Sequence, residues 1–149
     1  SLLVHLIDTG IDEYLAATSR LSGTGEERLR ALVHAHVSVI AKNVDQANVV
    51  FHQWRHVEGP ERRYLLDKRG AYARRIHDIV KAGIADGSFT ATIDGWVAVL
   101  TILGILNWTS EWYMSTGPEP VEVISDGLFQ IIVSGLTRDR LPAADVAAS

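Results

Sequence analysis

The sequence predicts an all-α protein built from about six helices, and three observations support this fold class. Apolar residues recur at spacings of three and four along most of the chain, which is the period of an amphipathic helix. No run alternates between apolar and polar residues as a half-buried strand would. Hydrophobic residues make up 47% of the 149 residues, which is enough for one ordered core.

We expect one folded domain over residues 1–137 and a flexible tail over residues 138–149. The tail reads RDRLPAADVAAS, and chain ends rich in small residues tend to fray. The helical pattern starts abruptly at Ser1. We therefore expect this chain to be a fragment whose first helix is cut.

Composition limits the classes of protein that the chain can represent. A formal net charge of −4 argues against a nucleic-acid-binding module, which usually carries a basic surplus. The absence of cysteine excludes a disulfide framework and thiolate metal sites, and it fits a reducing cytoplasm. Ser1–Thr18 lacks the basic start of a signal peptide. The longest apolar run, Ile93–Thr109, is shorter than the roughly 20 residues of a membrane span. We expect a cytoplasmic protein with no membrane partner.

The first two helices are predicted over Leu2–Ala17 and from Thr24 to about Asn43. Leu2–Ala17 carries apolar residues on one side and acidic residues on the other. Thr24 can cap the second helix, with two glutamates in the first turn, where the helix dipole favours acids. The apolar stripe of the second helix consists of Leu29, Leu32, Val33, His36, Val37 and Ile40.

A short third helix is expected over Asp45–His56, and a long fourth helix over Pro60–Ala85. Proline is well placed in a first helical turn, so Pro60 marks the start of the long helix. Gly87 suits the left-handed conformation that often ends a helix. Asp94 can then cap the next helix.

The fifth helix, roughly Gly95–Met114, and the sixth, Pro120–Leu136, are apolar on every side. A helix that is apolar all round must be buried all round, and one core of this size cannot cover two of them. We therefore predict a homodimer in which these helices pair with their two-fold mates. A central helix pair inside a monomer is the alternative. The predicted interface residues are Trp96, Leu100, Leu128, Phe129 and Ile132.

One stretch resembles a known family. Residues 81–89 read KAGIADGSF and are followed by Asp94. This is similar to the junction hydrophobic-x-x-Gly-x-x-x-Gly-x-Phe in the C-terminal domain of TetR-family transcriptional regulators. Asn107–Tyr113, with Gly117-Pro118 after it, resembles a subgroup that includes actinobacterial repressors of sterol and fatty-acid catabolism. The chain departs from the family in lacking the N-terminal helix-turn-helix domain. DNA could be contacted only through that absent domain, and we assign no DNA-contacting residue.

The resemblance implies that a ligand sits inside the helical bundle. The walls would supply His36, Phe51, Trp54, Tyr72, Leu103 and Asn107, with Trp108 nearby. Core packing is the alternative explanation for each of these residues. Asn107 is the most informative, because an amide amid apolar residues is unfavourable unless it bonds a neighbour, a dimer mate or a ligand.

We therefore predict the effector-sensing and dimerisation domain of a TetR-like regulator, acting as a repressor on a small hydrophobic effector. The resemblance suggests an acyl-CoA, because the long helix could offer its phosphates several cations, although such a face is usually only solvated. The alternative function is a stand-alone dimeric ligand-binding module or scaffold. The cations are Arg62, Arg63, Lys68, Arg69, Arg74 and Arg75.

We predict neither an enzyme nor a metal or cofactor site. No phosphate-binding loop, nucleophile elbow, cysteine nucleophile or zinc-protease motif is present. His52 and His56 are four residues apart, a workable metal-binding spacing. No carboxylate stands at a matching spacing with them, so a packed or exposed histidine pair is the better interpretation.

Overall fold

The computed structural model describes residues 1–116 and 120–138, and within these ranges every regular element is a helix. The predicted all-α fold class is confirmed. The predicted tail covers residues 138–149. All of it after residue 138 lies outside the described residues. No helix among the described residues has the length and apolarity needed to cross a membrane. The elements are α1 (Leu2–Ala17), α2 (Gly25–Lys42), α3 (Val44–His52), the 3-10 helix η1 (Gln53–His56), α4 (Gly59–Ala85), α5 (Gly95–Thr116) and α6 (Val121–Thr137).

Helix starts follow the capping residues that the sequence offers. Thr24 and Glu27 form a reciprocal capping box at the start of α2. The side chain of Asp94 accepts a hydrogen bond of 2.9 Å from the N–H of Val97 in the first turn of α5. The expected third helix is instead split, because the chain tightens from α3 into η1 at Gln53.

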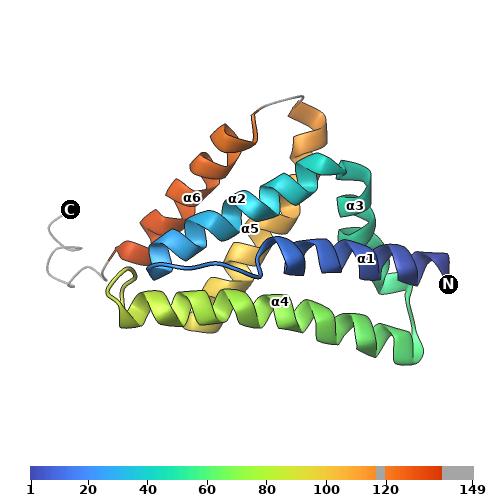
Figure 1. Ribbon diagram of the computed structural model, residues 1–149, viewed down its shortest axis with the longest axis horizontal. Helices are drawn as coiled ribbons and strands as arrows, with labels where there is room; N and C mark the ends of the chain where they lie inside the picture. The colour runs from blue at the N-terminus through green and yellow to red at the C-terminus, as the bar shows by residue number, and fades with distance from the viewer. Residues whose placement is uncertain (117–119, 139–149) are drawn as a thin grey trace, which may run out of the picture.

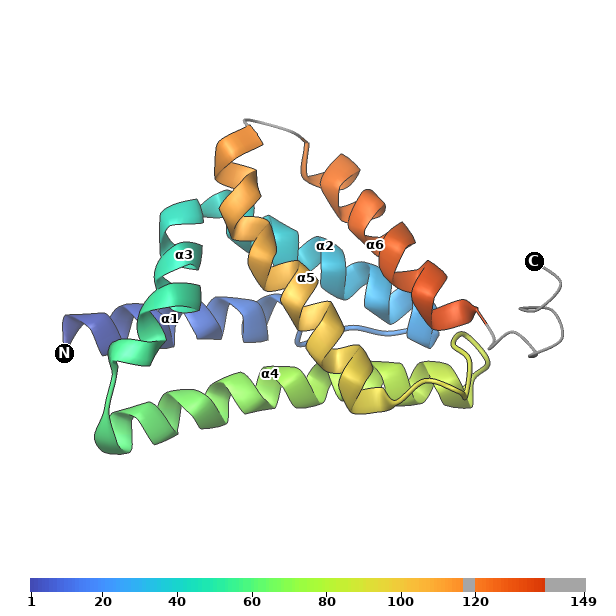
Figure 2. The same cartoon turned by 180° about the vertical axis from the view of Figure 1, so that it is seen from behind.

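α2 is the central helix, and it packs against each of the other five α-helices. Figures 1 and 2 show α4 running along one side of the molecule, α5 crossing it, and α6 lying against α2. The stripe predicted for α2 is buried throughout. α2 therefore contributes a buried face to the larger core cluster of the bundle.

Small residues fix the contact between the start of α2 and the end of α4. A Cβ at Gly25 would overlap the backbone of Gly83, and a Cβ at Gly83 would overlap the ring of Phe89. Gly87 ends α4 with a φ of +84°, a conformation that favours glycine. The N–H of Gly25 donates to Oδ2 of Asp86 at 2.7 Å. The Gly-x-x-x-Gly-x-Phe pattern is thus a packing device that joins α4, the following loop and α2.

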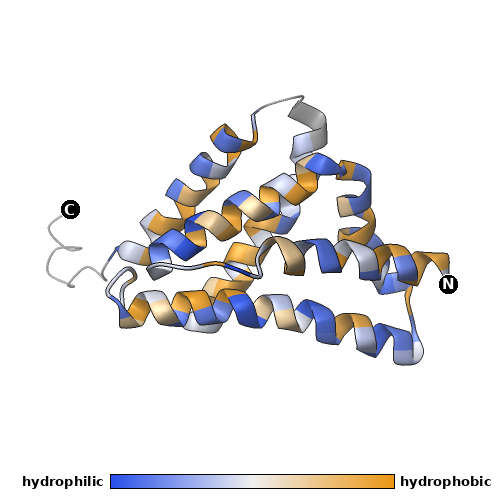
Figure 3. Cartoon of the chain, in the orientation of Figure 1, coloured by the Kyte–Doolittle hydropathy of each residue, from blue (hydrophilic) through white to orange (hydrophobic). Residues whose placement is uncertain are grey.

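The last two helices differ from each other in a way that the sequence did not predict. α5 is apolar all round, with Val99 and Leu106 buried and Trp96 and Leu100 exposed. α6 instead buries one apolar face against α2, and its exposed side carries Val123 and Ile131 among polar residues. Figure 3 shows both polar and apolar residues along this helix.

The predicted interface set is therefore corrected. Phe129 is only 1% exposed and Ile132 is 6% exposed, because both pack inside the chain. Leu128 is half-buried against the same core. Of the predicted interface residues, Trp96 and Leu100 lie open on the surface of a single chain.

Candidate functional site

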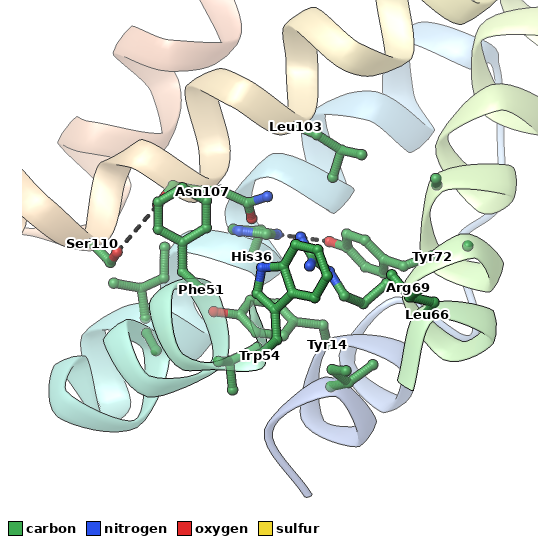
Figure 4. Close-up of a pocket in the computed structure, with 16 residues that line it drawn as sticks. Tyr14, His36, Phe51, Trp54, Leu66, Arg69, Tyr72, Leu103, Asn107 and Ser110 are labelled. Carbon is green, nitrogen blue, oxygen red and sulfur yellow. Dashed lines mark hydrogen bonds between the residues drawn. The ribbon is translucent and has the colours of Figure 1, made fainter. Parts of the chain in front are cut away.

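A cavity of about 370 Å³ lies inside the bundle, with walls from α1, α2, α3, η1, α4 and α5 (Figure 4). This volume falls within the range of pockets that bind small organic molecules. No aspartate or glutamate is among its lining residues, all of which belong to the described part of the chain. The lining consists of Ile11, Tyr14, His36, Ile40, Ala47, Val50, Phe51, Trp54, Leu66, Arg69, Gly70, Tyr72, Ala73, Leu103, Asn107 and Ser110.

The structure brings six of the seven predicted pocket residues together around this cavity: His36, Phe51, Trp54, Tyr72, Leu103 and Asn107. Trp108 is the exception and is 57% exposed. Leu103, Asn107 and Ser110 share one face of α5, at spacings of four and three. Trp108 is one residue, and hence about 100°, away from that face. Its prediction as a pocket residue is wrong for this reason.

His36 and Tyr72 form a buried polar pair across the cavity wall. Nδ1 of His36 lies 2.8 Å from the Tyr72 hydroxyl. The ring of Tyr14 lies 4.5 Å from that of His36, measured between centroids. Burial lowers the pKa of His36 from 6.5 to about 3, so this imidazole is neutral at physiological pH. Burial also raises the pKa of Tyr72 and of Tyr14, which both keep their protons.

The direction of this hydrogen bond follows from its chemistry. Nδ1 of His36 is the acceptor that the structure offers to the buried hydroxyl proton of Tyr72. A buried hydroxyl without an acceptor is costly, so we assign the proton to Tyr72 and the Nε2–H tautomer to His36. Nε2 is buried and has no hydrogen-bond partner within the described residues. His36 therefore holds a buried N–H donor that no described residue accepts.

Arg69 brings a positive charge to the same cavity. Its guanidinium carbon lies 4.2 Å from the centre of the Trp54 ring, and that of Arg62 lies 4.4 Å from the same centre. Burial, and next the nearby charge of Arg62, lower the pKa of Arg69, although a guanidinium stays protonated at neutral pH. In the described part of the chain, no carboxylate forms an ion pair with Arg69.

Asn107 contributes an amide to the wall formed by α5. Its side chain makes no hydrogen bond to any residue that the structure describes, while its backbone carbonyl accepts one of 3.1 Å from Ser110 Oγ. Figure 4 shows the Asn107 side chain directed from α5 toward the same space as those of His36 and Trp54. The amide can therefore both donate and accept a hydrogen bond in the cavity.

Comparison with known proteins supports the fold and gives the family. A family model described as "Tetracyclin repressor-like, C-terminal domain" matches residues 22–136. The chain belongs to this family. No curated protein matches it in sequence. The solved structures described below are less than 25% identical to this TetR-like domain and therefore show the fold alone.

Three of these structures illustrate the likeness. A bacterial regulatory protein of the TetR family from Rhodococcus RHA1 is 22% identical, with a TM-score of 0.84 over 93% of this chain and 74% of that one. The TetR-family regulator PfmR from Thermus thermophilus is 21% identical, with a TM-score of 0.81 over 91% and 75%. AibR, in complex with isovaleryl coenzyme A and operator DNA, is 18% identical, with a TM-score of 0.77 over 87% and 72%.

Ten of the 16 lining residues of this TetR-like domain were not among the predicted pocket residues, and the contributions of α1 and of Arg69 matter most for the chemistry. Ile11 and Tyr14 bring α1 into the wall. They are three residues apart, so the helical spacing was an available signal. Arg69 was recognised as one cation among several on α4, but nothing in the sequence separated it from its neighbours.

Three other cations of α4 have partners outside the cavity. Lys68 pairs with Asp8 and Asp12 of α1. Arg75 donates to the backbone carbonyl of Leu15 at 2.7 Å. Arg62 donates to the backbone carbonyl of Val57 at 3.3 Å, just beyond η1. These contacts tie α4 to α1 and η1, and among the basic residues that were expected to serve a ligand, Arg69 is the one that lines the cavity.

The two histidines considered for metal binding have different surroundings. His52 contacts Glu111 of α5, and His56 is exposed at the end of η1. No group of three potential metal ligands gathers anywhere in the described ranges. His52 therefore serves the packing of α3 on α5 in this fold.

Proposed function

We propose that this chain is the effector-sensing and dimerisation domain of a TetR-family transcriptional repressor. The observation that carries the proposal is the cavity, which has apolar walls and two polar groups without a hydrogen-bond or ion-pair partner among the described residues: the Asn107 amide and the Arg69 guanidinium. Native interiors satisfy nearly all of their buried polar groups. A bound molecule would supply the missing partners. Regulators of this family are in general not enzymes.

The effector that suits this cavity is a small hydrophobic molecule with a polar end. A hydrophobic carboxylic acid and its acyl-CoA thioester are the two chemical forms that we consider. AibR, with the same fold, binds isovaleryl coenzyme A, which supports the thioester. A cavity of about 370 Å³ would enclose the acyl group and leave most of the coenzyme A outside.

Occupation of the cavity would be communicated through α1. Ile11 and Tyr14 touch the cavity directly, and Lys68 and Arg75 tie α1 to α4. A ligand that changes the wall would thus change the position of α1 relative to α4. Control of DNA affinity requires that the ligand bind the two arrangements unequally.

The exposed apolar side chains of α5 and α6 support the dimerisation role. Between these helices lies a groove of about 340 Å³ with a mostly apolar lining, which includes Val97, Ile105 and Ile131. An exposed apolar patch of this kind marks an interaction surface, and an isologous two-fold contact would bury it against its own copy. The large exposed residues are Trp96, Val97, Leu100 and Trp108 on α5 and Val123 and Ile131 on α6.

Titration calorimetry with matched hydrophobes tests the sensing role. Octanoate, octanol and octanoyl-CoA share one hydrocarbon chain, so binding of any of them shows that the cavity accepts a ligand. Leu103→Trp would fill the cavity and weaken that binding, whereas Trp108→Phe, on the outer side of α5, would leave it unchanged. Native mass spectrometry of the purified chain would show a co-purified effector. If no probe binds and none co-purifies, the proposal is wrong.

A further inference from the structure

The polar groups of the cavity have a common chemical character. Arg69 offers only donors. Asn107 adds an amide N–H₂. No aspartate or glutamate of the described chain lines the cavity to match them. The cavity thus combines donors with one formal positive charge and no compensating anion.

Arg69 has no hydrogen-bond or ion-pair partner among the described residues, unlike Lys68, Arg62 and Arg75 on the same helix. Lys68, one position earlier, contacts two carboxylates of α1. Arg62 and Arg75 donate to backbone carbonyls. Arg69 has only the face of the Trp54 ring as a described contact. A cation partly removed from water is stabilised by a paired anion, and the open side of this guanidinium is the cavity.

The remaining walls indicate what the anion is attached to. They are formed by aliphatic and aromatic side chains from every surrounding helix, among them Ile11, Ile40, Val50, Phe51 and Leu103. Such a lining favours a hydrocarbon or aryl group that carries little further charge. One cation in an apolar cavity matches a ligand with one negative charge.

We propose that the cavity binds a hydrophobic monocarboxylic acid as the free carboxylate, with Arg69 as its counter-ion and Asn107 as an additional donor. This inference rests on the proposed sensing function and narrows its effector class. A guanidinium grips a carboxylate through two parallel N–H donors. A thioester carbonyl is neutral, and the phosphates of its coenzyme A would lie outside a cavity of this size. An acyl-CoA would therefore leave Arg69 without its anion.

The test compares octanoate, octanol and octanoyl-CoA on the wild-type chain and on two Arg69 variants. Wild type is expected to bind octanoate about tenfold or more tightly than either of the other two probes. Arg69→Gln should lose about tenfold in octanoate affinity while octanol affinity stays within about twofold. Arg69→Lys should keep part of the preference for the acid, because the charge remains. The unchanged octanol affinity shows that the Arg69→Gln cavity is intact.

Arg63→Gln is the matched control, because Arg63 is exposed on the same helix and does not line the cavity. It should bind octanoate as wild type does. The inference is overturned if Arg69→Gln keeps the octanoate affinity, if Arg63→Gln loses it equally, or if octanol or octanoyl-CoA binds wild type as tightly as octanoate. In each of these cases a ligand still binds, so the sensing role survives. If none of the three probes binds and no effector co-purifies, both proposals fail.

Discussion

The hydroxyl of Tyr72 on α4 and Nδ1 of His36 on α2 lie 2.8 Å apart in the interior of the bundle. His36 is 2% exposed and Tyr72 is 6% exposed, so water cannot replace either partner. The pair joins the central helix to the longest one and fixes which imidazole nitrogen carries the proton. It therefore links the stability of the fold to the chemistry of the site.

Tyr72→Phe should destabilise the chain by about 1–2 kcal/mol, because it leaves a buried imidazole nitrogen without its partner. Urea denaturation followed by circular dichroism measures this change. Tyr14→Phe is the control, since the Tyr14 hydroxyl lines the same cavity but makes no hydrogen bond to a described residue. Equal effects of the two substitutions would show that the His36–Tyr72 bond contributes nothing.

The buried His36 should make stability depend on pH. Its pKa is about 3 in the folded chain and 6.5 in the unfolded reference. Between these values the unfolded chain holds a proton that the folded chain lacks, so stability is lost as pH falls from 6.5 toward 3. Tyr14, Tyr72 and Arg69, which share the cavity with His36, do not titrate in this range.

The comparison that isolates this effect is between wild type and His36→Gln at pH 7 and pH 5. The wild-type chain should lose about 2 kcal/mol more of its unfolding free energy between these two pH values than the variant does. His34→Gln, an exposed change on the same helix, should retain the wild-type pH dependence. A His36→Gln chain that still shows the full slope would mean that other groups cause it.

Local sequence signals predicted most helix boundaries because capping is a local interaction. Thr24 and Asp94 cap α2 and α5 through residues three positions away, and Gly87 ends α4 by its own backbone conformation. The break between α3 and η1 had no such signal. An α turn and a 3-10 turn differ little in local energy, and here tertiary contacts of Trp54 with the arginines of α4 accompany the change.

The sequence predicts site residues only where the spacing of apolar residues shows which face of a helix a side chain occupies. His36 and Tyr72 lie on apolar stripes and were placed correctly, while Trp108 was wrong because one residue turns a side chain by about 100°. Arg69 and Lys68 look alike in sequence, and only the packing of α1 pairs Lys68 and leaves Arg69 at the cavity. Such a distinction depends on contacts about 60 residues apart along the chain.

Gly25→Ala should destabilise the chain by about 3 kcal/mol, the upper end of the usual cost of overpacking. The added methyl group would overlap the backbone of Gly83, which cannot move aside as a flexible side chain could. Thermal unfolding measures the effect. Gly70→Ala is the matched control, because the nearest atom to its new Cβ is the end of the Arg74 side chain, at 3.2 Å. Alanine is the better helix former, so this control should be neutral or stabilising; a comparable loss there would argue against a specific contact at Gly25.

Leu100→Lys should convert a dimer into a folded monomer. Leu100 is 68% exposed in a single chain and lies on the same side of α5 as Trp96, four residues earlier. A lysine there costs the fold of one chain little, but it places two like charges near the two-fold axis that we propose. Sedimentation velocity at micromolar concentration gives the mass, and circular dichroism reports the helicity. Leu2→Lys, at a leucine that is 74% exposed on α1, should leave the mass unchanged. A wild-type chain that sediments as a monomer, or a Leu100→Lys chain that stays dimeric, would place the interface elsewhere or remove it.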